Sequence, residues 1–398
     1  MDFEKRANFY KNYLNNNIIP FWLNHSIDKN NGGFFTCLNR NGECYDTDKF
    51  MWLQHREVWT FSMLYNNHEK NPLYLETAVF GAEFLKKHGM DENGDWYFSM
   101  DKEGNPLIQP YNIFSDCFAT MAFAQLFKAS GKKEYADIAL RSFRRIINRK
   151  ENPKGKYSKS VEGSRSLKGF SLPMILCNLV LEIEHLLSQE EVEETLRFGV
   201  NEVMNVFYKE DLGIIVENVT VDGELHDSFD GRLVNPGHGL ESMWFVMDIA
   251  KRWKNKELIQ QCVDISLKLI NYGWDKDYEG IFYFLDRKGA PLQQLEWDQK
   301  LWWVHLEAAI TMLKGYQLTG NEDCLKWYSK LHDYIWKNFV DNEYGEMFGY
   351  LNRKAEVLLD LKGGKWKGCF HVPRAVFQLG KISAEIHRLN KMKTINAI

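Results

Sequence analysis

The sequence predicts an all-α protein, an (α/α)6 toroid in which six helix hairpins close into a ring and short β-hairpins gather at one mouth. Three observations support this prediction. A unit recurs six times along the chain, each unit carries two helical segments of different character, and the first and last units are as apolar as those between them. Open solenoids need polar capping units at their ends. A closed ring is therefore the better prediction.

The repeating unit opens with an acidic or amide residue, which a glycine follows two to four positions later. A short aromatic strand, a polar turn and a second strand come next, and turns such as Arg40-Asn41-Gly42-Glu43 have the Asn-Gly chemistry of β-hairpins. The openings are about 60 residues apart, and we assign residues 1–398 to a single barrel domain on this basis. They lie at Asp28, Asp91, Asn152, Asp211, Asp277 and Asp341.

Two helical segments follow each hairpin. The first is apolar on nearly all sides, as in residues 114–128 and 301–313, and is expected in an inner ring that is packed on both faces. The second is more amphipathic and charged, as in residues 134–148 and 321–338, and is expected in an outer layer. The hairpins lead into the inner helices, so the functional site should lie at that mouth.

The composition limits the classes of function. The 398 residues are 14% aromatic, and 50 basic against 54 acidic side chains give a formal charge of −4. No Lys/Arg block and no basic stripe of the kind that a phosphate backbone requires is present, so nucleic acid is not an expected partner. Aromatic rings suit the apolar face of a sugar, although a bulky core explains much of the same content.

The cysteines and the hydropathy indicate a compartment. Seven cysteines, an odd number without a Cys-x-x-Cys pair, stand mostly in apolar segments such as Met174-Ile175-Leu176-Cys177. This pattern is typical of reduced, buried side chains. The first residues lack the apolar core of a signal peptide, and no uncharged apolar run is long enough to cross a membrane. We therefore expect a cytoplasmic protein without membrane contact.

Polar residues recur where the inner helices begin. Helix amino-termini carry free N–H groups and the positive end of the helix dipole, so their convergence suits an anionic intermediate. His238 and Glu241 are three residues apart and share a helix face, and Trp303 and Glu307, four apart, do the same. His305 is offset from this phase and is expected at a helix flank. The residues at these positions are Arg56, Glu57, Asp116, His238, Glu241, Trp302, Trp303, Glu307, His371 and Arg374.

Four stretches, in order along the chain, resemble the N-acylglucosamine 2-epimerases, a family also known as renin-binding protein. They are Gly32-Gly33-Phe34-Phe35, residues 45–59, Pro236-Gly237-His238-Gly239-Leu240-Glu241, and Trp366-Lys367-Gly368-Cys369-Phe370-His371-Val372-Pro373-Arg374. The resemblance extends from about residue 20 to about residue 385. It implies an (α/α)6 fold and the interconversion of N-acetyl-D-glucosamine and N-acetyl-D-mannosamine, an amino sugar substrate pair.

The residues supply a mechanism for that reaction. Epimerisation at C2 of the open-chain sugar removes a proton from one face and returns one to the other, which needs two acid/base groups on opposite sides. Histidine serves either way near neutral pH, and His238 and His371 match the family's two catalytic histidines. Arg56 matches the family's arginine and is expected to stabilise the enediolate, with a salt bridge to Glu57 as the structural alternative.

The other candidates have roles that the sequence leaves open. Glu241, which we group with the catalytic residues, and Glu307 would bind sugar hydroxyls, orient the histidines or assist ring opening. Trp303 would stack on the ring. Where cellobiose epimerases have a further histidine on the third inner helix, this chain has Pro173-Met174-Ile175-Leu176, which favours the N-acetylhexosamine branch. The residues expected to bind substrate are Glu307, Trp303, Asp116, Trp302 and Arg374.

Cofactors and partners follow from the same resemblance. The chemistry requires no cofactor, and no metal site is expected. Nucleotides activate some members, so ATP is a candidate allosteric activator, and its suspected site is the loop Gly363-Gly364-Lys365-Trp366-Lys367-Gly368, which is not a P-loop. A homodimer is a further expectation.

Several alternatives stay open on the sequence alone. The substrate could be mannose or cellobiose, handled by a 2-epimerase or aldose-ketose isomerase of the same superfamily. A glycoside hydrolase could use Asp116, Glu241, Asp298 and Glu307 as its carboxylates. Further alternatives are a zinc site on Cys369 and His371 with Cys117, and a non-catalytic binding protein. A nicotinamide site is set aside because Gly237-His238-Gly239 lacks the third glycine and the preceding strand.

Overall fold

A computed structural model describes residues 1–159, 161, 164 and 166–396. Six helices form an inner ring, and their middle turns are buried on nearly all sides. The inner helices are α3 (Met51–Asn67), α5 (Ile113–Ser130), α7 (Ser171–Ile183), α10 (Pro236–Arg252), α12 (Trp302–Thr319) and α14 (His371–Asn396).

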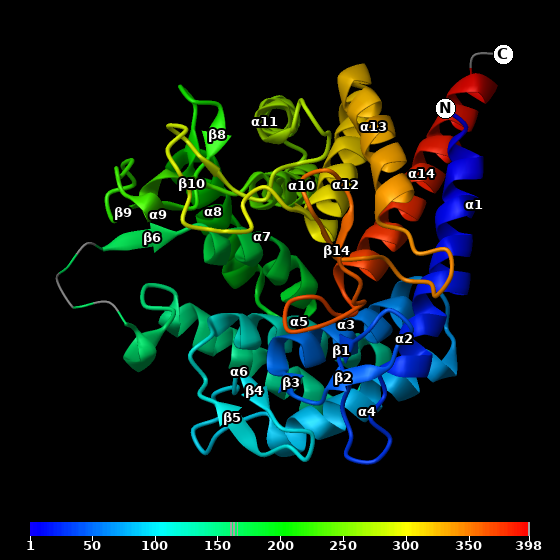
Figure 1. The fold of residues 1–398 in the computed structure, drawn as a ribbon, viewed down its shortest axis with the longest axis vertical. Helices are drawn as coiled ribbons and strands as arrows, with labels where there is room; N and C mark the ends of the chain where they lie inside the picture. The colour runs from blue at the N-terminus through cyan, green and yellow to red at the C-terminus, as the bar shows by residue number, and fades with distance from the viewer. Residues whose placement is uncertain (160, 162–163, 165, 397–398) are drawn as a thin grey trace.

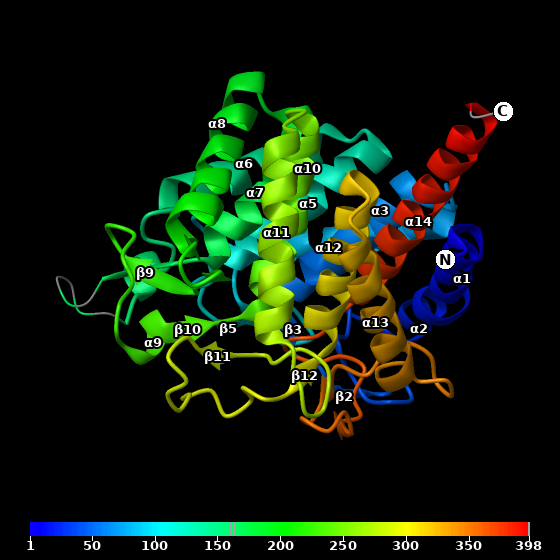
Figure 2. The same cartoon turned by 90° about the horizontal axis from the view of Figure 1, so that it is seen from above.

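A second layer of helices surrounds this ring (Figure 2). These helices bury one face only, as the amphipathic pattern of residues 134–148 predicted. The outer helices are α1 (Phe3–Tyr13), α4 (Pro72–His88), α6 (Lys133–Arg149), α8 (Gln189–Asn201), α11 (Lys256–Gly273) and α13 (Glu322–Asn338). A π-helical turn (Leu14–Ile18) continues α1 into α2 (Ile19–His25), and α9 (Phe229–Arg232) is one short turn.

The ring closes through the two ends of the chain. The unit that opens at Asp341 ends in a single helix, α14, and the sixth outer helix is α1, which packs along α14 (Figure 1). The Tyr10 hydroxyl bonds the Tyr328 hydroxyl at 2.6 Å and His332 Nδ1 at 2.9 Å, so α1 is also tied to α13. Helix α1 therefore serves as the outer partner of the inner helix α14.

Buried lysines anchor the turns that open three of the six units. Asp28 accepts hydrogen bonds from the backbone N–H groups of the two residues after Lys29 and pairs with Lys49 at 2.8 Å. The same pairing recurs between Asp341 and Lys362 at 2.9 Å. In the fifth unit the anchored residue is Asp275, at 3.0 Å from its lysine, whereas the predicted opening residue Asp277 has an exposed side chain.

The strands pair between neighbouring units as well as within hairpins. Only the pairs β1 (Cys37–Leu38) with β2 (Cys44–Asp46) and β7 (Tyr208–Lys209) with β8 (Ile214–Ile215) are local among the described two-stranded sheets. The others join a strand that enters an inner helix to the hairpin of the next unit, always antiparallel. They are β3 (Lys49–Phe50), β4 (Ser99–Met100) and β5 (Pro106–Ile108); β6 (Leu167–Gly169) and β9 (Asn218–Thr220); β10 (Leu233–Val234) and β11 (Leu285–Asp286); and β12 (Lys300–Leu301), β13 (Tyr350–Leu351) and β14 (Val357–Leu359).

This strand pairing fixes the spacing of the inner-helix amino-termini around the mouth. The backbone N–H of Met51, the first residue of α3, donates to the Phe98 carbonyl of the next unit, and the backbone N–H of Trp302 at the start of α12 donates to the Gly349 carbonyl.

Six of the seven cysteines are buried, Cys44 is exposed, and all seven are free thiols. Within the described ranges, no helix combines the length and apolarity needed to span a bilayer.

Candidate active site

A cavity of about 610 Å³ occupies the mouth of the ring. Each of the six inner helices contributes at least one side chain from its first turn, because the helices point their amino-termini at the same space. These residues are Trp52, Phe114, Ser171, His238, Trp302 and His371. Side chains from the strands and loops, among them Tyr283, Tyr350 and Trp366, complete the wall.

His238 stands in the first turn of α10. The backbone N–H of His238 donates a hydrogen bond to the side chain of the N-cap residue Asn235, and this bond fixes where the helix begins. His238 Nδ1 lies 3.0 Å from a carboxylate oxygen of Glu217, and this leaves Nε2 as the nitrogen free for substrate. Burial lowers the pKa of His238, but Glu217, helped by Glu241, outweighs it and holds that pKa above the usual value.

His371 is the first residue of α14 and is held in the same way by a different carboxylate. Its Nδ1 lies 2.8 Å from Glu307 Oε1. Burial, together with the nearby charges of Arg56 and Arg374, lowers the pKa of His371 well below the usual value. The ring of Trp303 adjoins both imidazoles, with centroids 5.2 Å from His238 and 5.7 Å from His371.

Arg374 links the carboxylates behind the histidines. Its Nη2 donates to Glu241 Oε1 at 2.5 Å and to Glu307 Oε1 at 2.6 Å. Within the part of the chain that the structure describes, Glu241, Glu307 and His371 form the one group spaced closely enough for a metal ion. The guanidinium already supplies the positive charge between the two carboxylates, so this group fits a buried ion pair.

Arg56 forms no ion pair with a carboxylate of the described residues, and its buried Nε has no hydrogen-bond partner among them, although the charges of Glu241 and Glu307 act on its pKa. It lies against the rings of Phe118, Trp52 and Phe370, at 4.0, 4.4 and 4.6 Å from their centroids. Burial and the nearby Arg374 lower the pKa of Arg56 to about 9, so it remains protonated at neutral pH.

The alternative of an Arg56–Glu57 salt bridge is not realised, because consecutive helix residues point in different directions. Glu57 is fully buried and accepts a hydrogen bond from the Ser26 hydroxyl. Burial raises the pKa of Glu57 to about 8, so it is largely neutral at pH 7.

Three predicted placements differ from the structure. Asp116 does not line the cavity: it is buried towards α6, 3.2 Å from Arg149, because the cavity face of α5 carries Phe114 and Phe118 on either side of it. Glu307 does not line the cavity either, and acts through His371. His305, expected at a helix flank, is fully buried, and its Nε2 accepts from the backbone N–H of Ile281 at 2.9 Å.

The remaining predicted residues do line the cavity. The structure brings the two histidines and Arg56 together with the others that the sequence singled out: Glu241, Trp302, Trp303 and Arg374. Sequence reasoning missed Glu217, although a lone carboxylate after Ile214-Ile215-Val216 is a signal, since a buried strand tolerates an acid only when it is paired. It also missed Asn178, Tyr283, Glu296 and Gln299.

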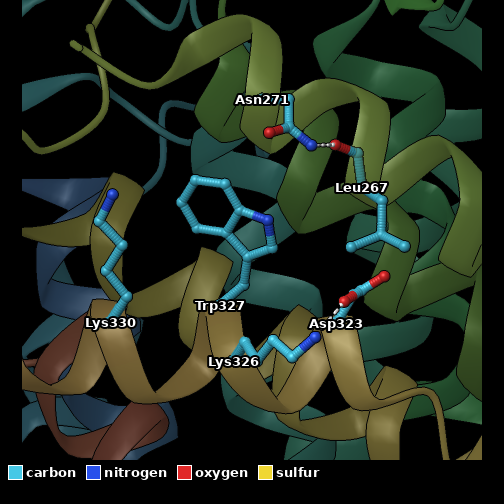
Figure 3. Close-up of a pocket in the computed structure, with 6 residues that line it drawn as sticks. All are labelled: Leu267, Asn271, Asp323, Lys326, Trp327 and Lys330. Carbon is cyan, nitrogen blue, oxygen red and sulfur yellow. Dashed lines mark hydrogen bonds and ion pairs between the residues drawn. The ribbon is translucent and has the colours of Figure 1, made fainter.

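A second, smaller depression of about 260 Å³ lies outside the ring, between α11 and α13 (Figure 3). Lys326 pairs there with Asp323 at 2.9 Å, and Lys330 lies over the ring of Trp327. No histidine lines this depression, and its lysines face open solvent. The ring cavity therefore holds the chemistry.

Fold and site together define a class of protein. Two anchored histidines and an unpaired guanidinium in the bore of an (α/α)6 toroid suit proton transfer on a small polar substrate, and the relatives below are isomerases that act on carbohydrates. The structure of cellobiose 2-epimerase from Bacillus thermoamylovorans B4167 superposes with a TM-score of 0.83 at 20% identity, covering 95% of this chain and 99% of that chain. This likeness confirms the predicted toroid.

The chain belongs to the N-acylglucosamine 2-epimerase (GlcNAc 2-epimerase) family, whose sequence profile matches residues 33–375. The N-acylglucosamine 2-epimerase of Mus musculus is 38% identical over 371 residues, and that of Bos taurus is 37% identical over 367 residues. Each alignment covers 90% of this chain and 87% of the relative. The resemblance predicted from four motifs is confirmed.

Proposed function

We propose that this protein interconverts N-acetyl-D-glucosamine and N-acetyl-D-mannosamine by proton transfer at C2. One observation carries the proposal: His238 and His371 line the same cavity from different helices, and each Nδ1 is held by a carboxylate of its own. Both imidazoles therefore have Nε2 left for a substrate in the cavity, and the ring of Trp303 adjoins both. The names of the most similar relatives support the choice of substrate.

The two histidines begin the reaction in different protonation states. The lowered pKa of His371 makes it neutral and able to accept a proton, whereas the raised pKa of His238 favours the protonated form. His371 Nε2 takes the C2 proton of the open-chain sugar, and the electron pair of that C–H bond moves towards the carbonyl oxygen to give an enediolate. His238 then returns a proton to the opposite face of C2. In the reverse direction the roles exchange.

Arg56 stabilises the enediolate. Its guanidinium is buried and charged and forms no direct ion pair with a described carboxylate, so its field is available for negative charge that develops on the sugar oxygen. Arg374 differs, because Glu241 and Glu307 already occupy its Nη2. We assign Arg374 and Glu307 to positioning His371, and Glu241 to contact with the sugar from the cavity wall.

The geometry weighs against the rival chemistries. Glu241 and Glu307 share one guanidinium, and Asp116 and Asp298 do not line the cavity, so the four carboxylates of the glycoside hydrolase alternative are not free there. Burial raises the pKa of the Cys369 thiol well above its usual value, which disfavours the thiolate that zinc would need.

Other predictions extend the proposal without being part of its chemistry. In the suspected nucleotide loop, Lys367 is buried 2.8 Å from Glu346, whereas Trp366 lines the cavity. ATP bound at this loop would therefore act on the cavity wall. ATP activation, the homodimer and the cytoplasmic location stay predictions.

Proton NMR of N-acetyl-D-mannosamine with the protein in D2O tests the proposal. We expect the anomeric signals of N-acetyl-D-glucosamine to appear with deuterium at C2, and His238→Asn and His371→Asn to abolish the conversion. If N-acetyl-D-mannosamine is unchanged while mannose or cellobiose reacts, the substrate assignment is wrong. If none of the three reacts, the proposal of an epimerase fails.

A further inference from the structure

An amide without a partner faces the cavity from the third inner helix. Helix α7 presents Ser171, Met174, Ile175 and Asn178 to the cavity, at the spacing i, i+3, i+4 and i+7 that marks one helix face. Asn178 is 8% exposed, and its side chain makes no hydrogen bond to another described residue. Buried amides normally have partners. The amide of Asn178 is open to the cavity, so its partner is water or a molecule that fills the cavity.

The surroundings of Asn178 are apolar. Phe118 and Met121 from α5, and Met174 and Ile175 from α7, form with it what we call the α5–α7 wall of the cavity. The charged groups that line the cavity stand on α3, α10, α14 and the loop before α12 instead. The cavity thus has a charged side, where protons move, and an apolar side with a single amide in it.

We propose that the α5–α7 wall binds the N-acyl group of the substrate and that Asn178 selects for it. The inference rests on the proposed C2 epimerase function, because C2 carries both the migrating proton and the acylated nitrogen. The acyl group then lies within reach of the two histidines that act at C2, and α7 is the apolar neighbour of α10, the helix that carries His238. Phe245, two turns further along α10, lines the same region.

The chemistry of the two groups is complementary. A secondary amide offers one N–H donor and one carbonyl acceptor, and the carboxamide of Asn178 offers both a carbonyl oxygen and an NH2 group. The acyl methyl would lie against Met174 and Ile175. A sugar with a hydroxyl at C2 places no methyl there and leaves the α5–α7 wall in contact with water, so the wall discriminates in favour of N-acylated sugars.

Substitution of Asn178 by Leu tests the inference, because Leu is of similar size but cannot form hydrogen bonds. We expect Asn178→Leu to raise KM for N-acetyl-D-mannosamine about tenfold, the effect of one lost hydrogen bond, and to leave kcat within about twofold. The matched control is Asn201→Leu, which makes the same change at an exposed position on α8. Asn178→Ala serves as a second variant, and the thermal midpoint of each variant reports folding.

Inhibition by two unreactive alcohols separates the acyl contact from general damage. N-acetyl-D-glucosaminitol carries the acyl group and D-glucitol does not, and we expect Asn178→Leu to weaken the first about tenfold and to leave the second unchanged. An unchanged KM, or equal weakening of both alcohols, overturns the inference. If the wild type does not convert N-acetyl-D-mannosamine, the proposed function itself fails, so the two failures are distinguishable.

Discussion

Replacing Glu217 by Gln should make His238 a weaker proton donor. The carboxylate lies 3.0 and 3.1 Å from His238 Nδ1, and both side chains are mostly buried. Without the negative charge of Glu217, only Glu241 opposes the effect of burial, which lowers the pKa of His238. A hydrogen bond to a charged group contributes about 1.5–3 kcal/mol, which corresponds to roughly a ten- to hundredfold loss of rate at neutral pH.

The sign of the pH dependence follows from the role of His238. As the donor it must be protonated, so the rate falls on the alkaline side as pH rises through the pKa of His238. In the wild type that pKa is raised, and activity persists above the usual range of histidine; in Glu217→Gln the alkaline fall should move to lower pH. The acid fall follows the protonation of His371 and should stay where it is.

The assay is C2 deuterium exchange and epimerisation of N-acetyl-D-mannosamine, followed by NMR between about pH 5 and pH 9, a range that spans the titration of histidine. Glu224→Gln, an exposed carboxylate of the same hairpin, is the control. A Glu217→Gln enzyme that loses rate equally at all pH values, or keeps its alkaline limb, would refute the reasoning about His238.

Three further substitutions have defined outcomes. His238→Asn should stop epimerisation but allow His371 to exchange the C2 proton of one epimer for deuterium without inversion; NMR that shows both epimers formed at the wild-type rate would contradict the two-base scheme. Arg56→Met should lower kcat roughly a hundredfold or more without lowering the urea midpoint, because it removes an unpaired buried charge; a large loss of stability would assign Arg56 to the fold instead. Arg374→Met should cost about 3–5 kcal/mol in urea unfolding, because it leaves Glu241 and Glu307 buried without their cation, and a change below about 1 kcal/mol would count against that ion pair.

Much of the fold could be predicted because its signals are local. The glycines of the unit openings, the turn residues and the two kinds of helix each depend on neighbours within one unit, so the two layers followed from periodicity. The pairing of α1 with α14 and of β3 with β4 could not be predicted, because contacts between distant segments leave no pattern in either segment. The opening residue of the fifth unit was predicted wrongly as Asp277 for a similar reason, because the sequence does not record that Asp275 is the residue that reaches Lys300.

The candidate site likewise contains residues that could be predicted from the sequence and residues that could not. His238, His371 and Arg56 were found because they are polar residues near the starts of different inner helices and match residues of the family that the chain resembles. Asp116 also lies near the start of an inner helix, yet each residue along a helix turns the side chain by about 100°, and Asp116 points to Arg149. Glu217 lies 21 residues before His238, on a different element. Its partnership depends on how the strand and helix meet, which sequence spacing does not record.

The closure of the ring by α1 against α14 has a consequence for biosynthesis. His371 lies in α14, and α1, which packs along α14, precedes it by more than 300 residues, so α1 cannot find its place before α14 has been made. A chain whose synthesis has not reached α14 lacks His371 and therefore lacks a complete site. Helices α1 and α14 pack along one another (Figure 1), so a circular permutant that links α14 to α1 and opens elsewhere would place α1 directly after α14 and remove that wait.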